Sequence, residues 1–364
     1  MSYVKSYQEI LDGIDDINPI LYARTRNQLS GAVTQLSPYI SRGVISLPLV
    51  RDRLLARHSA EDCQKLIQEL AWREYFQNVW WEKDEAIFSD IRFLRDDWQH
   101  AELVTAIIEA RTGIEEVDKG IRKLYDTGYM HNHVRMWVAS MACNLGGAHW
   151  HPMGKWLYYN LVDGDLASNF LSWQWVAGTS VNKKYTVNQA LIQACSESSQ
   201  TDSIIDFPRE EMLSVETPEV LLEHEPFALF TEYPEVEAVS TVTGARVCLY
   251  TPWTLDPTWR REQSARRILV IDPAWFDKYP VSELVLDFII RQGQTVMPEL
   301  EVHIGSVVDI PELHYAQAVF ALLHQTNRTW PVQFDTQSTL FPAVTGYYQS
   351  FYKYWQAVEK TISD

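Results

Sequence analysis

The hydrophobic periodicity of the chain changes near residue 195, and this change limits the folds available to it. Before that point apolar residues recur mostly every three or four positions, as in SAEDCQKLIQELAWREYFQNVWWEKD (59–84), which is the spacing of amphipathic helices. Beyond residue 240, short apolar runs such as RRILVI (266–271) alternate with helix-like segments, which is typical of a partly parallel α/β sheet. The sequence therefore predicts an all-α part followed by a small α/β part.

Capping and breaking residues place the ends of the predicted helices. Ser59 can cap the helix quoted above, because its hydroxyl can accept from the unpaired N–H groups of the first turn. Three further helices are predicted before residue 195, each followed by a glycine that can end it: GIEEVDKGIRKLYDT (113–127), MHNHVRMWVASMACNL (130–145) and GDLASNFLSWQWVA (164–177). These helices have short connections and predict one helical domain.

The region after residue 240 contains the predicted strands of the α/β part. Four apolar runs read as strands: ARVCLYTPW (245–253), RRILVIDPAW (266–275), LEVHIGSV (300–307) and WPVQF (330–334). Three segments read as helices: VSELVLDFIIRQG (281–293), PELHYAQAVFALLHQ (311–325) and TGYYQSFYKYWQAVEKTI (345–362). Neither GxGxxG nor GxxxxGK[ST] occurs in this region, so the sequence predicts no phosphate-binding loop for it.

Composition divides the chain in the same way. The net charge is −17, but residues 1–200 hold 20 basic and 24 acidic side chains, whereas residues 201–364 hold 11 and 24. The segment 196–240 is rich in Ser, Pro and Glu and predicts a linker or an extended wrap. We therefore predict a helical domain at 1–195, a linker at 196–240 and a small acidic α/β domain at 241–364.

Cysteine spacing and hydropathy indicate the cellular compartment in which the protein is expected. The four cysteines lie far apart without a CxxC pair, which argues against a disulfide framework and a local zinc or iron–sulfur site. No apolar run reaches the length of a membrane span, and the first residues lack the core of a signal peptide. The sequence therefore predicts a cytoplasmic protein with no membrane contact.

Several residue clusters permit both a functional and a purely structural interpretation. The chain has 14 Trp, which suits chromophore contact or base stacking, but also a Trp-rich core. Arg135 and Asp163 lie in apolar segments and predict a buried ion pair, either a plain core salt bridge or a pair set against a conjugated ring. Glu69, Trp72 and Arg73 share one helix face and form either a pocket for a stacked base or a solvated edge.

Four histidines offer an alternative metal site, which the spacing disfavours. His131, His133, His149 and His151 come as two pairs, each with its members two residues apart. Residues two apart on a helix point to different sides, so neither pair forms a ligand face. We predict no metal.

Four segments, in this order, resemble the FAD-binding helical domain of the DNA photolyase and cryptochrome family. They are TQLSPYISRG (34–43), ELAWREYF (69–76), the stretch from Thr112 to Ser140 that contains IRKLYDTGYMHNHVRMWVAS, and LVDGDLASNFLSWQWVAGT (161–179). They span roughly the first half of the chain. The resemblance implies a photolyase-type fold for residues 1–195 and FAD as cofactor.

The resemblance also implies roles for individual residues. Those expected around FAD are Thr34, Leu36 and Ser37 at the diphosphate, Arg73 in the pocket, the Arg135–Asp163 pair beside the isoalloxazine ring, Asp165 at the ring edge, Asn169 beside N5, and Asn132 between flavin and substrate. Those expected to line a cavity for a flipped pyrimidine dimer, and so to act in catalysis, are Glu69, Trp72, Asn132, Met136 and Trp175. A relay of Trp173, Trp150 and Trp98 is expected to carry electrons between the flavin and the surface.

The chain also departs from the family pattern. The family has Arg where His133 stands, Trp where Tyr129 stands, and often Asn or Gly where Phe170 and Leu171 stand, and the stretch SVNKKYTVNQ (180–189) replaces its usual continuation. Losing the arginine weakens the expected grip on a substrate phosphate, although Lys183, Lys184 and His133 could partly substitute. The amino-terminal antenna domain of the family is expected to be absent, so no antenna chromophore is predicted.

Two functions compete for this sequence. The first is light-driven splitting of cyclobutane pyrimidine dimers, a carbon–carbon lyase activity on damaged DNA in which reduced, photoexcited FAD donates an electron to the dimer. The five cavity residues favour this function. The second is a cryptochrome-like blue-light photosensor that contacts a signalling protein through the acidic carboxyl-terminal part. The charge of residues 201–364 and His133 favour the photosensor.

Overall fold

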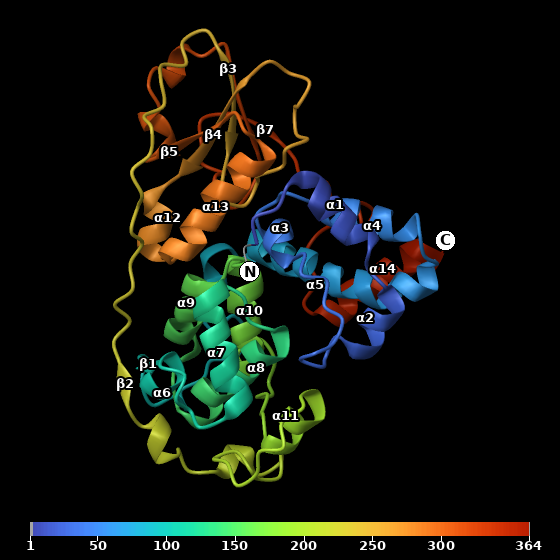
Figure 1. The fold of residues 1–364 in the computed structure, drawn as a ribbon, viewed down its shortest axis with the longest axis vertical. Coiled ribbons are helices and arrows are strands. Elements are labelled where there is room, and N and C mark those ends of the chain that lie inside the picture. Colours follow the sequence, from blue (N-terminus) through green and yellow to red (C-terminus); the bar gives the residue numbers. More distant parts are fainter. Residues whose placement is uncertain (1–2, 364) are drawn as a thin grey trace. The chain divides into compact units, whose positions relative to one another are not determined.

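The computed structural model describes residues 3–363 (Figure 1). The helices are α1 (Tyr7–Asp15), α2 (Pro19–Thr25), α3 (Ser37–Ser41), α4 (Leu47–Leu55), α5 (Ala60–Lys83), α6 (Thr105–Ile108), α7 (Glu115–Thr127), α8 (Asn132–Ser140), α9 (Trp150–Asn160), α10 (Leu166–Ala177), α11 (Gln189–Cys195), α12 (Pro273–Lys278), α13 (Glu283–Val296) and α14 (Phe351–Ser363). The strands are β1 (Leu103–Val104), β2 (His224–Glu225), β3 (Arg246–Tyr250), β4 (Arg266–Ile271), β5 (Leu300–Ile304), β6 (Ala318–Leu322) and β7 (Gln333–Asp335).

The chain forms two compact units, and each is built from separate stretches of sequence. The first, called the sheet unit here, comprises the residues up to Pro19, Thr34–Glu74 and the residues from Phe230 onward. The second, called the helical unit, comprises Ile20–Val33 and Tyr75–Leu229. These units differ from the predicted domain boundaries at 195 and 240, which stay a prediction.

The predicted caps and breaks define the long helices. The Ser59 hydroxyl accepts from the backbone N–H of Asp62 at 3.1 Å at the start of α5. Gly128 and Gly178 follow α7 and α10 with φ of 71° and 81°, a conformation that glycine adopts without steric cost. After α8 the chain continues through a single π-helical turn, Met141–Leu145, before Gly146. The helices predicted for 113–127, 130–145 and 164–177 are therefore confirmed.

Small residues let the helices of the helical unit approach one another closely. A Cβ atom on Gly120 of α7 would lie 2.6 Å from a methyl group of Val134 in α8. A Cβ atom on Gly154 of α9 would lie 3.3 Å from Phe170 and 3.4 Å from Trp173 in α10. These glycines set the close packing of α7 on α8 and of α9 on α10.

The segment predicted as a linker or wrap adds a strand to the helical unit. Strand β2 pairs antiparallel with β1, with Leu103 opposite Glu225 and Val104 opposite His224. Where β1 ends, the backbone N–H of Thr105 donates to the carbonyl of Glu223 at 3.0 Å. The part of the segment before Phe230 thus belongs to the helical unit in an extended form.

The sheet unit contains five parallel strands in the order β5-β4-β3-β6-β7. Strand β3 pairs with β4 and β6, so the chain first builds one side of the sheet and then the other. This order is that of an open doubly wound α/β sheet. Residues 311–325 were predicted as a helix, which is wrong, because they form a 3₁₀ turn and strand β6. A short apolar run such as AVFAL fits a buried helix and a buried strand equally well by periodicity.

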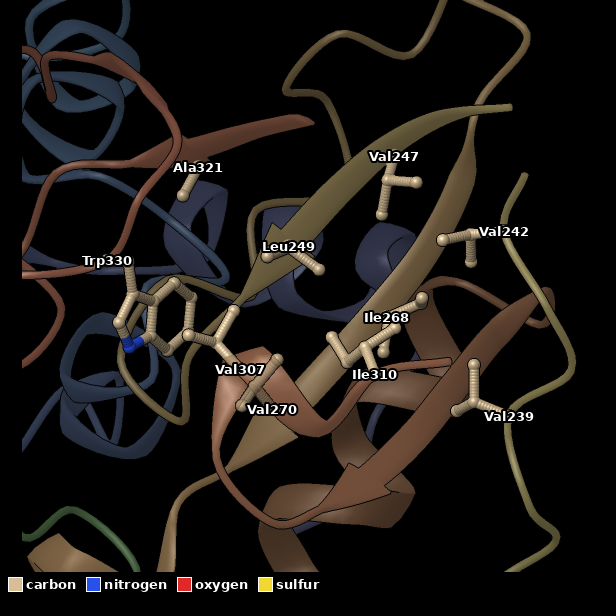
Figure 2. Packing of buried hydrophobic residues seen from close by; sticks show 10 residues of the cluster. All are labelled: Val239, Val242, Val247, Leu249, Ile268, Val270, Val307, Ile310, Ala321 and Trp330. Atoms are coloured by element: carbon tan, nitrogen blue, oxygen red, sulfur yellow. The ribbon is translucent and has the colours of Figure 1, made fainter. Parts of the chain in front are cut away.

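An aliphatic core explains why the strands are nearly continuous apolar runs. Buried side chains from β3, β4 and the segments around them pack against one another (Figure 2): Val239, Val242, Val247, Leu249, Ile268, Val270, Val307, Ile310, Ala321 and Trp330. Strands of a parallel sheet are typically buried on both faces, which favours such residues.

The helices, the metal-ligating side chains and the thiols can each be described for the residues that the structure covers. Within 3–363, no helix is long and apolar enough to cross a membrane. Among the same residues, no group of three or more His, Cys, Asp or Glu could hold a metal ion. The four cysteines are free and buried.

Candidate functional site

Arg135 and Asp163 form the buried ion pair that the sequence predicts. One Nη of Arg135 donates to both carboxylate oxygens of Asp163, at 3.0 and 2.9 Å, and Nε donates to the carbonyl of Met130 at 2.8 Å. The Asp163 side chain is 2% exposed and that of Arg135 is 22% exposed. A charge-assisted bond of this kind is stronger than a hydrogen bond between neutral groups. The pairing fits both interpretations offered by the sequence.

Asp165 and Asn169 organise the first turn of α10. One carboxylate oxygen of Asp165 accepts from the backbone N–H of Ser168 at 2.7 Å, and the other accepts from Gln77 Nε2 at 2.7 Å. The Asn169 amide donates to the carbonyl of Gly154 at 2.9 Å. Asp165 is therefore both a helix cap and a buried charge with two fixed donors.

The start of α10 offers polar atoms that suit a heteroaromatic ligand. The Ser168 hydroxyl is buried and has no hydrogen-bond partner among the described residues. A buried polar atom without a partner costs free energy, which a bound polar group can recover. With Asp163, Asp165 and Arg135 in the same unit, the donors and acceptors fit a ring that carries both carbonyl and N–H groups, as an isoalloxazine does. Arg135, Asp163, Asp165 and Asn169 are the residues of the helical unit that would hold it.

Four further predicted flavin residues, Thr34, Leu36, Ser37 and Arg73, belong to the sheet unit. Arg73 donates from Nη1 to the Ser41 hydroxyl at 2.7 Å, which ties α5 to the end of α3. Leu36 is buried, and its backbone N–H donates to the Thr34 hydroxyl at 3.4 Å, directly before α3 begins at Ser37. Their predicted contact with the diphosphate stays a prediction.

Three of the predicted cavity residues lie in the helical unit. Asn132 is exposed and Met136 is half-buried, one turn apart on α8, and the Asn132 amide lies 4.0 Å from the Met136 sulfur. Trp175 on α10 is 37% exposed, and its ring lies 5.4 Å from that of Tyr185. An amide, a thioether and an exposed indole can stack on and bind a nucleobase.

The two remaining cavity residues belong to the sheet unit. The Glu69 carboxylate accepts from Lys65 Nζ at 2.8 Å on the partly exposed face of α5. Trp72 stacks on Phe351 of α14 with ring centroids 3.7 Å apart and planes 11° apart. One face of this indole is therefore covered by the carboxyl-terminal helix. No motif in the sequence indicates the Phe351 contact.

The three predicted relay tryptophans differ in exposure. Trp173 and Trp150 are each 2% exposed, whereas Trp98 is 43% exposed. The Trp98 ring meets His149 edge-on at 5.3 Å, and His149 stacks on Trp150 at 5.5 Å. Rings in contact thus run from the surface to a buried indole. Electron transfer along them stays a prediction.

Two functional candidates were missed by the sequence. The Trp150 indole N–H donates to Asp90 Oδ1 at 2.8 Å, although the two residues are 60 positions apart. Gln77 reaches Asp165 across 88 positions. Only Gln77 could have been found from the sequence. It lies four residues after Arg73, a predicted site residue, and hence on the same face of α5.

Burial shifts the titration of three histidines in the helical unit. Burial, followed by the charge of His133, lowers the pKa of His131 to about 4. Burial also lowers the pKa of His149, against the opposing effect of Asp90, and that of His100. These rings are predominantly neutral at pH 7, which suits His131 as the acceptor that caps α8.

The residues that depart from the family pattern, and the cations near them in the sequence, make contacts that the structure describes. His133 packs edge-on against Trp137 with centroids 6.2 Å apart. Lys184 pairs with Asp97 at 2.7 Å, whereas Lys183 is exposed. Of the three cations considered as substitutes for the missing arginine, Lys184 is thus already partly neutralised by a carboxylate.

Comparison with known proteins identifies the class of this domain. Residues 66–230 match the family described as FAD binding domain of DNA photolyase. Deoxyribodipyrimidine photo-lyase of Streptomyces griseus is 32% identical over 165 residues, which are 45% of this chain and 36% of that protein. Cryptochrome DASH of Gloeobacter violaceus is 31% identical over 169 residues, 43% of this chain and 33% of that protein. A solved cryptochrome of Synechocystis is 25% identical, with a TM-score of 0.49 over 54% of this chain and 44% of that one.

Residues 66–230 are therefore similar to the FAD-binding domain of DNA photolyases, and the relatives that match this chain include a photolyase and a cryptochrome DASH. FAD is the cofactor of this domain. The matched part corresponds to about a third of each of the two curated relatives, 36% of one and 33% of the other.

Proposed function

We propose that this protein splits cyclobutane pyrimidine dimers in DNA with light. The observation that carries the proposal is the set of exposed or half-buried groups on α8 and α10, where Trp175 is 37% exposed in a mostly buried helix. An exposed indole on α10, with an amide and a thioether on the neighbouring helix α8, suits a base that has been flipped out of a duplex. The match of residues 66–230 to the photolyase domain supports the same reaction class.

In this proposal the residues of the chain bind and orient, and the cofactor performs the electron chemistry. FAD, when bound, supplies the light absorption and the electron that opens the cyclobutane ring. The Arg135–Asp163 pair and Asp165 provide fixed charges beside it, which need no reorganisation when charge moves. Within the helical unit, Trp175 stacks on the dimer and Asn132 hydrogen-bonds to it.

A binding and repair assay with a matched control tests this function. Trp175→Ala should weaken binding of a dimer-containing oligonucleotide by about tenfold or more, because one base–aromatic stack contributes about 1–3 kcal/mol. Trp81→Ala is the control, since Trp81 is also exposed, at 42%, and lies in the same unit. Equal weakening by both variants, or no light-dependent loss of dimers with the wild-type protein, would refute repair.

Photosensing is the second candidate function, and the charge distribution favours it. Residues 201–364 carry 24 acidic and 11 basic side chains, a surface that disfavours DNA and suits a basic protein partner. His133 stands where the family has an arginine. A gel shift separates the two functions, because a photosensor should bind dimer-containing and undamaged DNA equally.

The relay can be tested whichever function holds. Trp173→Phe should abolish or strongly slow the light-driven bleaching of bound FAD by an external reductant, while FAD stays bound. The absorption spectrum before and after blue light measures both quantities. Bleaching at the wild-type rate in this variant would refute the relay.

A further inference from the structure

Asp90 and Trp150 form a buried indole–carboxylate pair. The indole N–H donates to Asp90 Oδ1 at 2.8 Å. The indole is 2% exposed, and the Asp90 side chain is 10% exposed. A carboxylate so poorly hydrated needs fixed donors to remain charged. Trp150 Nε1 is one of these donors.

The second carboxylate oxygen is fixed by the backbone. Asp90 Oδ2 accepts from the backbone N–H of Arg95 at 3.0 Å. The Arg95 guanidinium points elsewhere, to the carbonyl of Gly178 and to Asn182. His149 Nε2 lies 4.0 Å from Oδ1, and burial lowers the pKa of this histidine. The negative charge of Asp90 therefore faces the indole N–H. None of the contacts given above brings a permanently charged cation to this carboxylate.

Such a pair changes what happens when the indole loses an electron. The oxidised ring carries a positive charge, and a carboxylate at hydrogen-bond distance in a poorly solvated site stabilises that charge strongly. The oxidised N–H is also a much stronger acid than the neutral one. Proton transfer within a hydrogen bond that is already formed requires no diffusion.

We propose that Asp90 accepts the indole proton of Trp150 when this tryptophan is oxidised in the relay. The inference rests on the proposed function, because the oxidant is the photoexcited flavin, reached through Trp173. One electron leaves Trp150, its N–H bond breaks, and the proton moves to Asp90 Oδ1. The products are a neutral indolyl radical and a neutral carboxylic acid. Loss of the positive charge slows the return of the electron and so lengthens the charge separation.

The resting hydrogen bond is tested in the protein with or without FAD. In spectra of the protein labelled with ¹⁵N in its indole groups, Trp150→Phe identifies the Trp150 signal. Asp90→Asn keeps one acceptor oxygen, which can serve the indole N–H, but removes the charge and the second acceptor, so the indole proton of Trp150 should move upfield. Glu359→Gln is the matched control, because Glu359 accepts from Trp355 Nε1 at 2.7 Å on the surface of α14. A Trp150 signal that does not move in Asp90→Asn would overturn the inference.

Flash photolysis of the FAD-bound protein tests the proton transfer itself. Transient absorption distinguishes the protonated tryptophan radical from the neutral one. In the wild type the conversion should be fast and slower in D₂O, whereas Asp90→Asn should slow it by about 100-fold or more. Glu359→Gln should leave the conversion unchanged.

The two ways of failing are distinguishable. Conversion at the wild-type rate in Asp90→Asn would overturn the role of Asp90 and leave the relay intact. A wild-type protein that binds FAD but forms no tryptophan radical would overturn the relay, and the role of Asp90 with it.

Discussion

One arginine in each unit shows a different way of holding charge. Arg135 in the helical unit depends on one carboxylate, that of Asp163, and one carbonyl. Arg267 in the sheet unit is 2% exposed and is surrounded by neutral acceptors, namely the Tyr250 hydroxyl and two backbone carbonyls, with Glu299 at 3.4 Å. Arg135 thus meets one opposite charge at one point, whereas Arg267 distributes its charge over neutral dipoles and the Glu299 carboxylate.

The two units also differ in the side chains at the places where a ligand could bind, which in the sheet unit are the carboxyl ends of the central strands. In open α/β sheets ligands bind where the strand order reverses, which here is between β3 and β6. At that place Trp253 stacks on His324 at 5.5 Å and on Phe276 at 6.2 Å. The helical unit instead leaves Trp175 exposed and the Ser168 hydroxyl unpaired among the described residues. Aromatic rings therefore fill this place in the sheet unit, whereas the helical unit leaves the Trp175 ring partly exposed.

The largest loss of stability is expected from removing the Asp163 carboxylate of the Arg135–Asp163 pair. Asp163→Ala leaves the Arg135 charge without its partner and should lower the free energy of unfolding by about 3 kcal/mol, the low end for a buried pair because Arg135 is partly exposed. Urea unfolding measures the loss, and FAD titration should show weakened binding. Asp163→Asn, which keeps an acceptor, should cost less. A loss below about 1 kcal/mol, the size expected for an exposed pair, would contradict the comparison.

His131 should make the stability of the helical unit depend on pH. Its pKa is about 4 in the folded protein because of burial and about 6.5 in the unfolded chain. Folding is therefore favoured most above pH 6.5, and up to about 3 kcal/mol should be lost as the pH falls toward 4. Urea midpoints between pH 8 and pH 4 measure this slope.

A conservative variant separates His131 from the other titrating groups. His131→Asn can still cap α8 but cannot be protonated, so the slope of stability against pH should become shallower. An unchanged slope would show that other groups cause it.

Gly43 tests the sheet unit through its backbone. The residue has φ of 69°, and an added Cβ would lie 2.4 Å from the carbonyl oxygen of Trp253. Gly43→Ala should therefore cost about 2 kcal/mol or more in thermal or urea unfolding, from the left-handed backbone and the clash together. Gly13→Ala is the control, because nothing lies within 4 Å of its added Cβ. That variant should be neutral or stabilise α1 by up to about 1 kcal/mol.

The smallest loss of stability is expected from removing one of the hydrogen-bond acceptors of Arg267. Tyr250→Phe removes one neutral acceptor from Arg267 and should cost about 1 kcal/mol, since the two carbonyls remain. Its unfolding free energy should be compared with that of Asp163→Ala under the same conditions. Equal losses in the two variants would remove the distinction between concentrated and distributed charge.

Local rules were reliable wherever a feature depends on neighbours in the sequence. The end of α7 at Gly128 and the extent of α10 followed from periodicity and from the conformational freedom of glycine. The Arg135–Asp163 pair followed from the cost of leaving a charge alone in an apolar segment. The motif of residues 161–179 indicated the FAD-binding domain, which the family match confirms.

Local rules failed where two conformations bury the same residues. The run AVFAL in β6 could have been a helix, and only its pairing with β3 and β7 makes it a strand. The backbone of a strand needs hydrogen bonds from distant segments, which no window of sequence contains. The same limit explains why the Trp72–Phe351 stack was not predicted.

The sequence by itself determined the helical pattern, the order of the flavin-domain motifs and the acidity of the second half, because each depends on residue types at short spacing. Beyond the Arg135–Asp163 pair, only the tertiary structure decided which groups meet. Asp90 lies 60 positions before Trp150, and Gln77 lies 88 positions before Asp165. A hydrogen bond forms between atoms about 3 Å apart, so long-range partners exist only once helices and loops have packed.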